Sequence, residues 1–151
     1  MKNRGKITQP TKQTGAEDCT NKSGTNNVNN AHDYLTLIQS GDICLGAPIY
    51  FFFNLGTANL VNTSQLINLD EVARIAGKYG LSVRIIGAAD SATGTTTINN
   101  GLSQARANYI ATELQKRGMS TGNITIVSEG GIDEYSPNEA NRHTRIMLYL
   151  K

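Results

Sequence analysis

The hydrophobic pattern of the chain changes from strand-like to helix-like between residues 53 and 62. Ile49–Phe53 is a dense apolar run that contains every phenylalanine of the sequence and lies between Pro48 and Asn54. Such a run predicts a core strand. Apolar residues then recur at helical spacing from a cap-like Asn62 as far as Gly80. This pattern predicts an amphipathic helix of about 16 residues.

The rest of the chain repeats this alternation and ends in two strand-like segments. Ser82–Ala88 is strand-like, and a second helix is predicted over Asn99–Arg117, with Gly118 at its C′ position. Two further strands are predicted at 123–127 and 144–150, separated by a loop that contains glycine and proline. The order β-α-β-α-β-β predicts an α+β fold in which two main helices pack on a mixed sheet of about four strands.

The first 31 residues differ in composition from the rest of the chain. Only six are apolar, and five are basic against two acidic. Such a segment buries too little apolar surface to offset its ordering entropy, so we predict a disordered tail or linker over 1–31. Residues 32–47 fit a short helix as well as an edge strand, and we expect an N-terminal extension that packs on a domain formed by 48–151. The tail therefore carries a charge of +3 and the rest of the chain −1, which together give the net +2. The near-neutral domain lacks the basic surface of a nucleic-acid-binding protein.

Motifs of the common enzyme and metal-binding classes are missing from the sequence. It has no glycine-rich phosphate loop, dinucleotide fingerprint, G-x-S-x-G or H-E-x-x-H motif, so we expect no enzyme, no metal and no cofactor. Cys19 and Cys44 match no zinc or redox spacing. They are either two unrelated thiols or a disulfide that closes a loop of about 25 residues. No signal peptide is visible and no apolar run is long enough to span a bilayer, so membrane attachment is expected only through a parent chain or anchor.

Two residues of opposite charge are the strongest candidates for a ligand site. Asp90 lies just past the second strand, and Arg106 lies two turns into the helix that returns from it. The short connection brings them close together, beside the free N–H groups of the helix start. A carboxylate and a guanidinium complement the ammonium and carboxylate of an amino acid. Each also has an ordinary structural interpretation: Asp90 in an Asx turn, and Arg106 on a solvated helix face, paired with Glu113 or Glu129.

The residues around this pair resemble a known family. The helix carries Asn99-x-x-Leu102-Ser103-x-x-Arg106-Ala107, preceded by Gly87-Ala88-Ala89-Asp90. This stretch is similar to the signature of the OmpA-like C-terminal domains that bind peptidoglycan. Further matches are Phe51-Phe52-Phe53-Asn54 and Asn141-Arg142-His143-Thr144. The resemblance covers about residues 48–150 and is closest to the Bacteroidetes-type branch.

The resemblance implies non-covalent binding of peptidoglycan through the diaminopimelate of its stem peptide, held by Asp90 and Arg106. The other ligand-site residues that it implies are Asn99 and Leu102, which would shape the pocket, Ala89, and Arg142, which would brace it. It implies a periplasmic domain, a monomer or weak dimer, that anchors the outer membrane or a parent outer-membrane protein to the cell wall. Replacing either Asp90 or Arg106 with alanine is then expected to abolish wall binding and leave the melting temperature nearly unchanged.

The sequence also departs from the family pattern. Ala88 and Ala89 stand where the family has a polar His-Thr pair, so backbone groups must replace the hydrogen bonds of those side chains. This loss keeps open the alternative of an OmpA-fold scaffold or protein-interaction domain that no longer binds peptidoglycan. Phe52 replaces a polar residue of the first strand, and we expect the 32–47 segment to cover it.

Overall fold

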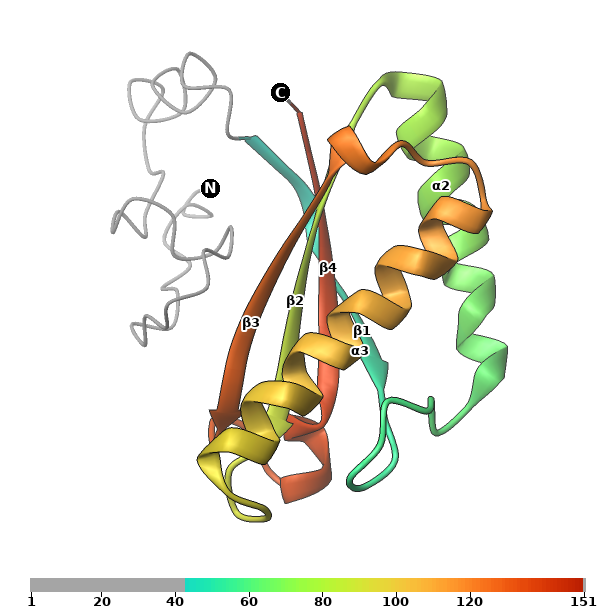
Figure 1. Cartoon of the computed structure of the whole chain (residues 1–151). Coiled ribbons are helices and arrows are strands. Elements are labelled where there is room, and N and C mark those ends of the chain that lie inside the picture. Colours follow the sequence, from blue (N-terminus) through green and yellow to red (C-terminus); the bar gives the residue numbers. More distant parts are fainter. Residues whose placement is uncertain (1–42, 151) are drawn as a thin grey trace, which may run out of the picture.

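A computed structural model describes residues 43–150, in which one four-stranded sheet packs against two long helices (Figure 1). The elements are β1 (Ile43–Phe52), α2 (Ile67–Tyr79), β2 (Ser82–Asp90), α3 (Thr96–Lys116), β3 (Ile124–Ile132) and β4 (His143–Leu150). Short 3-10 helices lie at Thr63–Leu66, Thr121–Asn123 and Asn138–Asn141. The predicted order β-α-β-α-β-β and the α+β class are confirmed.

The sheet is mixed, as expected, with the strand order β1-β4-β2-β3. β4 runs antiparallel to both β1 and β2, whereas β3 is parallel to β2. A parallel pair needs a crossover connection, and α3 provides it between β2 and β3. Both helices lie on the same face of the sheet (Figure 1), so the main core forms between that face and the helices.

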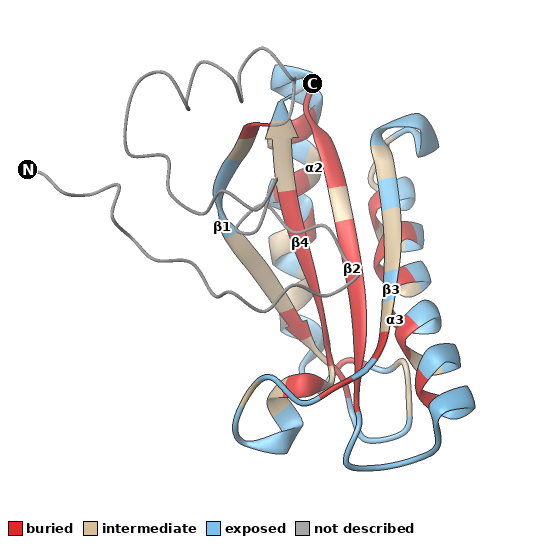
Figure 2. Cartoon of the chain, turned by 90° about the vertical axis from the view of Figure 1, so that its left-hand side faces the viewer, coloured by how far each residue is buried: buried red, intermediate tan, exposed pale blue. Residues whose placement is uncertain are grey.

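The main core is built from the apolar residues whose periodicity predicted the elements. Phe51 of β1, Leu69 of α2, Ile85 of β2, Ile110 of α3 and Ile146 of β4 are each fully buried within it. The two central strands, β4 and β2, carry the longest runs of buried residues (Figure 2). At about 1.5–3 kcal/mol for each large apolar side chain, burial of this layer is the main source of stability.

The strands extend further than the hydrophobic pattern predicted. β1 begins at Ile43 rather than Ile49, and β2 and β3 end at Asp90 and Ile132, which pair with each other. Asp90 is therefore the last residue of the strand and does not lie past its end. Ladder hydrogen bonds join backbone groups, so a strand can continue through glycine and polar residues that carry no hydrophobic signal.

Both helices begin at residues other than those predicted, because a 3-10 helix precedes α2 and Thr95 caps α3. The Asn62 side chain accepts a hydrogen bond from Ser64 N at 3.0 Å, and so caps the 3-10 helix that precedes α2. The Thr95 hydroxyl accepts a hydrogen bond from Ile98 N at 3.2 Å, so α3 begins at Thr96, three residues before the predicted start. A side-chain acceptor at the N-cap satisfies one of the free N–H groups of the first turn.

The N-terminal predictions fall mostly outside the described residues. Residues 43–47 belong to β1 at the sheet edge, whereas the predicted tail and the remainder of the 32–47 extension lie outside residues 43–150. Cys44 is disulfide-bonded, and Cys19, the only other cysteine of the sequence, is outside the described range. Neither helix in that range is long and apolar enough to cross a membrane.

His143 is a buried titratable residue at the start of β4. Its side chain is 0% exposed, and its ring lies edge-on to those of Tyr50 and Tyr135. Nδ1 lies 2.7 Å from the Ala140 carbonyl oxygen, which can only accept, so Nδ1 carries the proton. Nε2 lies 3.4 Å from Nη1 of Arg145. Burial lowers the pKa of His143 to about 4, and Arg145 adds to the shift.

We expect His143 to make the protein less stable in mild acid. The imidazole takes up a proton near pH 6.5 in the unfolded chain but only near pH 4 in the folded one. The free energy of unfolding is therefore not reduced by His143 above pH 6.5. It falls by up to about 3 kcal/mol as the pH is lowered from 6.5 to 4. Urea unfolding of the wild type and of His143→Gln at pH 6.5 and at pH 4 measures this loss of stability. Equal losses of stability in the two proteins would contradict the prediction.

Candidate functional site

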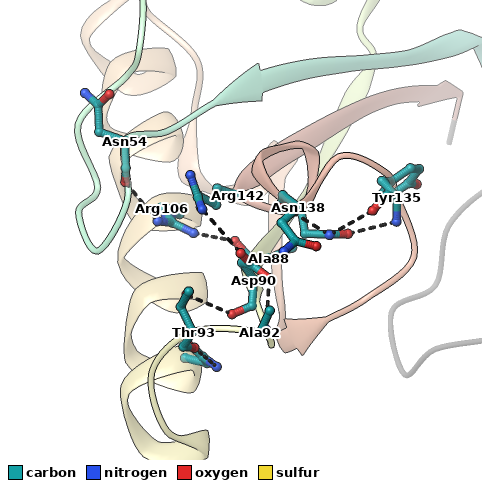
Figure 3. Close-up of polar contacts among 11 residues, drawn as sticks. Asn54, Ala88, Asp90, Ala92, Thr93, Arg106, Tyr135, Asn138 and Arg142 are labelled. Atoms are coloured by element: carbon teal, nitrogen blue, oxygen red, sulfur yellow. Dashed lines mark hydrogen bonds and ion pairs between the residues drawn. The ribbon is translucent and has the colours of Figure 1, made fainter.

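The carboxylate of Asp90 is buried and engaged on both oxygens. Asp90 is 3% exposed at the end of β2. Oδ1 accepts a hydrogen bond from Ala92 N at 2.9 Å, which closes the predicted Asx turn, and Oδ2 lies 3.4 Å from Nη2 of Arg142 (Figure 3). Its ion-pair partner among the described residues is therefore Arg142, the residue just before β4, and not Arg106.

Arg106 is buried against the sheet, so the interpretation as a solvated helix residue is wrong. It is 1% exposed, and its guanidinium donates to three backbone carbonyls. These are Thr57 O at 2.8 Å, and Ala88 O at 2.9 Å and Asn54 O at 3.2 Å (Figure 3). The Phe53 ring lies 5.5 Å from the guanidinium carbon. Arg106 thereby joins the loop that follows β1 to the end of β2.

The suggested partners of Arg106 pair elsewhere. Glu113 binds Lys116 and Arg117, and Glu129 binds Arg145. Burial lowers the pKa of Arg106 to about 10, with a further contribution from the charge of Arg142 and an opposing one from Asp90. The group stays protonated at neutral pH. Two guanidinium groups and one carboxylate therefore lie close together and leave one positive charge in excess.

Arg142 is the residue of the charged group that lines a pocket. Its side chain is 16% exposed, and Nε is buried without a hydrogen-bond partner among the described residues. It lines a pocket of about 490 Å³, mostly apolar, together with Phe52, Phe53, Asn54, Leu55, Val61, Pro137, Glu139 and Ala140. A guanidinium with unused donors at the edge of a pocket is suited to bind a carboxylate.

The remaining predicted site residues are spread around the Asp90 turn. Asn99 is 5% exposed, donates to Thr93 O at 3.0 Å and lines a second pocket of about 540 Å³, which is mainly polar. Ala89 is 1% exposed within β2. Leu102 is half-buried and lines neither of these two pockets. The structure thus groups Asp90, Arg106 and Arg142, and places Asn99 beside a different pocket.

Three residues of the quoted motifs to which the sequence assigned no role position this group. Ser103 of α3 is fully buried; its hydroxyl accepts from Gly130 N at 3.0 Å and is hydrogen-bonded to the Ser128 hydroxyl on β3. On β2, a Cβ at Gly87 would overlap the Ser103 carbonyl oxygen. The helix therefore packs directly on the strand, which brings Arg106 within reach of Ala88 O.

Asn141 is the third of these residues, and it shapes the loop before Arg142. Its side-chain oxygen accepts from the backbone N–H groups of Glu134 and Tyr135, at 3.1 and 2.9 Å. Its amide nitrogen donates to the carbonyls of Tyr135 and Asn138, at 3.0 and 3.3 Å. The buried amide thus fixes the turn from which Arg142 reaches Asp90.

Comparison with known proteins gives one family and one fold. The model of the OmpA family matches residues 52–145. Outer membrane protein 40 of Porphyromonas gingivalis is 34% identical over 92 residues, which are 60% of this chain and 24% of that protein. The chain therefore matches only about a quarter of the length of this relative.

Two solved structures have the same fold at low sequence identity. The OmpA-like domain of FopA1 from Francisella tularensis has a TM-score of 0.61 at 17% identity, over 73% of this chain and 81% of that one. The peptidoglycan-associated lipoprotein from Burkholderia pseudomallei has a TM-score of 0.57 at 19% identity, over 68% and 89%. The family match covers more than half of the sequence, and the motif resemblance is confirmed: the chain belongs to the OmpA family.

Proposed function

We propose that the domain binds peptidoglycan non-covalently. Family membership supports this, as does the shared fold with a lipoprotein described as peptidoglycan-associated. The observation that carries the proposal is the charge arrangement beside the pocket. Arg142 lines the pocket and pairs with the buried Asp90, while Arg106 adds a second buried guanidinium; neither Asp90 nor Arg106 lines the pocket itself. A buried site with one positive charge in excess gains from a ligand that brings a carboxylate.

The proposed ligand group is the amino acid head of diaminopimelate in the stem peptide. Its carboxylate would bind the guanidinium of Arg142, which lines the pocket, and its ammonium would bind the carboxylate of Asp90, the ion-pair partner of Arg142. Arg106 is a positioning residue in this scheme, because its donors are engaged by backbone carbonyls. The sequence-based roles of the two arginines are thus exchanged.

The shape of the pocket supports a ligand with an aliphatic chain behind a charged end. Phe52, Phe53, Leu55, Val61 and Pro137 give it an apolar wall, and Arg142 supplies a charge. The side chain of diaminopimelate is a short run of methylene groups that ends in an ammonium and a carboxylate. Apolar walls bind the methylene groups by removing their surface from water, which is favourable by about 25 cal/mol for each Å² of apolar surface buried.

Asp90→Asn should weaken binding to purified sacculi while the fold persists. Asparagine keeps the oxygen that accepts from Ala92 N, so the Asx turn survives, but the negative charge for the ammonium is lost. We expect affinity to fall by roughly 10- to 100-fold, the equivalent of about 1.5–3 kcal/mol for a charge-assisted hydrogen bond. Co-sedimentation with diaminopimelate-type sacculi, with free diaminopimelate as competitor, measures it.

The matched control for this variant is Glu71→Gln on α2. It also removes one negative charge, but Glu71 is exposed and pairs only locally, with Arg74. Wild-type sedimentation of the control beside a loss in Asp90→Asn supports a specific site. Sedimentation of Asp90→Asn at the wild-type level would contradict the proposed role of Asp90.

One observation favours the alternative, an OmpA-fold scaffold that does not bind the wall. Asp90 and Arg106 are 3% and 1% exposed, and both make hydrogen bonds within the protein. In a scaffold, these charges would serve only to hold the β1–α2 loop and the Asp90 turn together. Failure of the folded wild type to sediment with sacculi would favour this alternative and overturn peptidoglycan binding.

We further propose that the domain works in the periplasm and links the outer membrane, or a parent protein in it, to the wall. The relative from Porphyromonas gingivalis is an outer membrane protein. The disulfide at Cys44 agrees with this location, because disulfides persist in oxidising compartments such as the periplasm. Binding without turnover is sufficient for such a link.

A further inference from the structure

The central strands β4 and β2 carry buried residues on the face of the sheet opposite α2 and α3, although no helix or strand of residues 43–150 lies on that face (Figure 2). Ile86 of β2 and Met147 of β4 form a second apolar cluster there with the half-buried Val127 of β3, separate from the main core. Ile86 is 0% exposed and Met147 is 2% exposed. Apolar side chains on an uncovered sheet face would be largely accessible to water.

Polar groups on the same face are buried as well. Arg145 donates two hydrogen bonds to Glu129, each 3.0 Å long, and their side chains are 5% and 1% exposed. Arg145 pairs with Ile86 across the ladder, so its side chain lies on the face of the second cluster. Ion pairs on an open surface remain hydrated. The burial of this pair therefore indicates a covering layer.

Cys44 identifies the segment that supplies this layer. It pairs with Tyr149 across the β1–β4 ladder, and Tyr149 shares its face with Met147, two residues earlier on β4. The sulfur of Cys44 is therefore on the helix-free side of the sheet. Cys44 is disulfide-bonded, and the sequence contains one other cysteine, Cys19.

We propose that residues 20–42 pack on the helix-free face as a loop closed by a Cys19–Cys44 disulfide. Four strands spaced about 4.8 Å apart span roughly 15 Å. The residues between the two cysteines can reach about 80 Å when extended, enough to cross the sheet and return. Tyr34, Leu35, Leu37 and Ile38 are the densest apolar group before Cys44. They supply the surface that covers Ile86, Val127 and Met147.

Peroxide oxidation of the methionines tests this proposal on the full chain. Met147 is 2% exposed, and Met119, half-buried beside the main core, serves as an internal reference. Sulfoxide formation follows the exposure of the thioether. In the oxidised protein we expect Met147 to react several-fold more slowly than Met119. In Cys19→Ser, and in Leu35→Asp with both cysteines retained, Met147 should react several-fold faster than in the wild type, with Met119 unchanged.

Two further measurements complete the test. Peptide mapping without reductant should recover a fragment in which Cys19 and Cys44 are linked, and sedimentation equilibrium reports whether a second copy covers the face instead. Unchanged protection of Met147 in both variants would overturn the proposal, as would protection that appears only in a dimer. If Cys19→Ser fails to fold, Leu35→Asp still tests the proposal, because it retains both cysteines. Sacculus binding is a separate readout, and its loss or retention does not decide this proposal.

Discussion

Replacing Arg106 with methionine should lower the free energy of unfolding by about 3–5 kcal/mol, because each buried carbonyl left without a donor costs about 1–3 kcal/mol. Arg106 is 1% exposed, and its guanidinium donates to Asn54 O, Thr57 O and Ala88 O. Asn54 O also accepts from Thr57 N, so the loss falls mainly on Thr57 O and Ala88 O. Methionine fills much of the same volume but donates no hydrogen bond. Urea unfolding at pH 7, followed by circular dichroism, measures the change.

The control for Arg106→Met is the same substitution on the exposed surface. Arg74 of α2 is more than half exposed and pairs with Glu71 one turn earlier, so Arg74→Met should leave the urea midpoint close to that of the wild type. Arg106→Lys should fall between the wild type and Arg106→Met, because one ammonium cannot reach three carbonyls in the planar arrangement of a guanidinium. A midpoint for Arg106→Met equal to that of Arg74→Met would contradict the positioning role.

This expectation differs from the one that the sequence suggested for Arg106. A ligand-binding arginine at the protein surface can be removed with little loss of stability, and Arg106→Ala was expected to behave in that way. The structure places the guanidinium beneath the loop that follows β1, where it holds backbone groups of two elements. Loss of sacculus binding in an Arg106 variant would therefore report unfolding as well as recognition. Asp90→Asn is the sharper test.

The order of elements could be predicted because apolar residues mark the core-facing side of each one. Leu69, Val72 and Ala76 recur at helical spacing on α2, and the Phe51 and Phe53 side chains alternate with Phe52 in the predicted strand. The additional strand residues could not be predicted in this way. Backbone hydrogen bonds across the ladder hold these additional residues in their strands. They pair the start of β1, Ile43 to Leu45, with β4, and the end of β2, Ala89 and Asp90, with β3.

The sequence led to the charged residues that the structure brings together, but not to the contacts that hold each of them. The family motif led to Asp90, Arg106 and Arg142, which the structure groups together. The burial of Arg106 has a signal that the motif search did not use. Asn99, Ser103 and Arg106 recur at the same helical spacing as Ile110 and Leu114, and all five are buried. Polar residues in phase with an apolar stripe indicate hydrogen bonds inside the protein.

Replacing Gly87 with alanine should destabilise the protein by about 3 kcal/mol or more, the upper range for overpacking a core. The added Cβ would overlap the Ser103 carbonyl oxygen and lie 3.1 Å from the Ala107 Cβ. The overlapped atom belongs to the backbone of α3, so relief requires the helix to move off β2. That movement would strain the hydrogen bond from Gly130 N to the Ser103 hydroxyl and the one from Arg106 to Ala88 O.

Gly101→Ala on the same helix is the matched control, and its effect should have the opposite sign. A Cβ at Gly101 meets no atom within 4 Å, and alanine is favoured over glycine inside a helix by up to about 1 kcal/mol. The two variants add the same methyl group to the α3–β2 region, one at the contact and one away from it. Urea midpoints that move in opposite directions would show that stability depends on the close approach of α3 to β2. A Gly87→Ala protein as stable as the wild type would contradict that packing. It would also contradict our explanation of how Arg106 comes within hydrogen-bond distance of Ala88 O on β2.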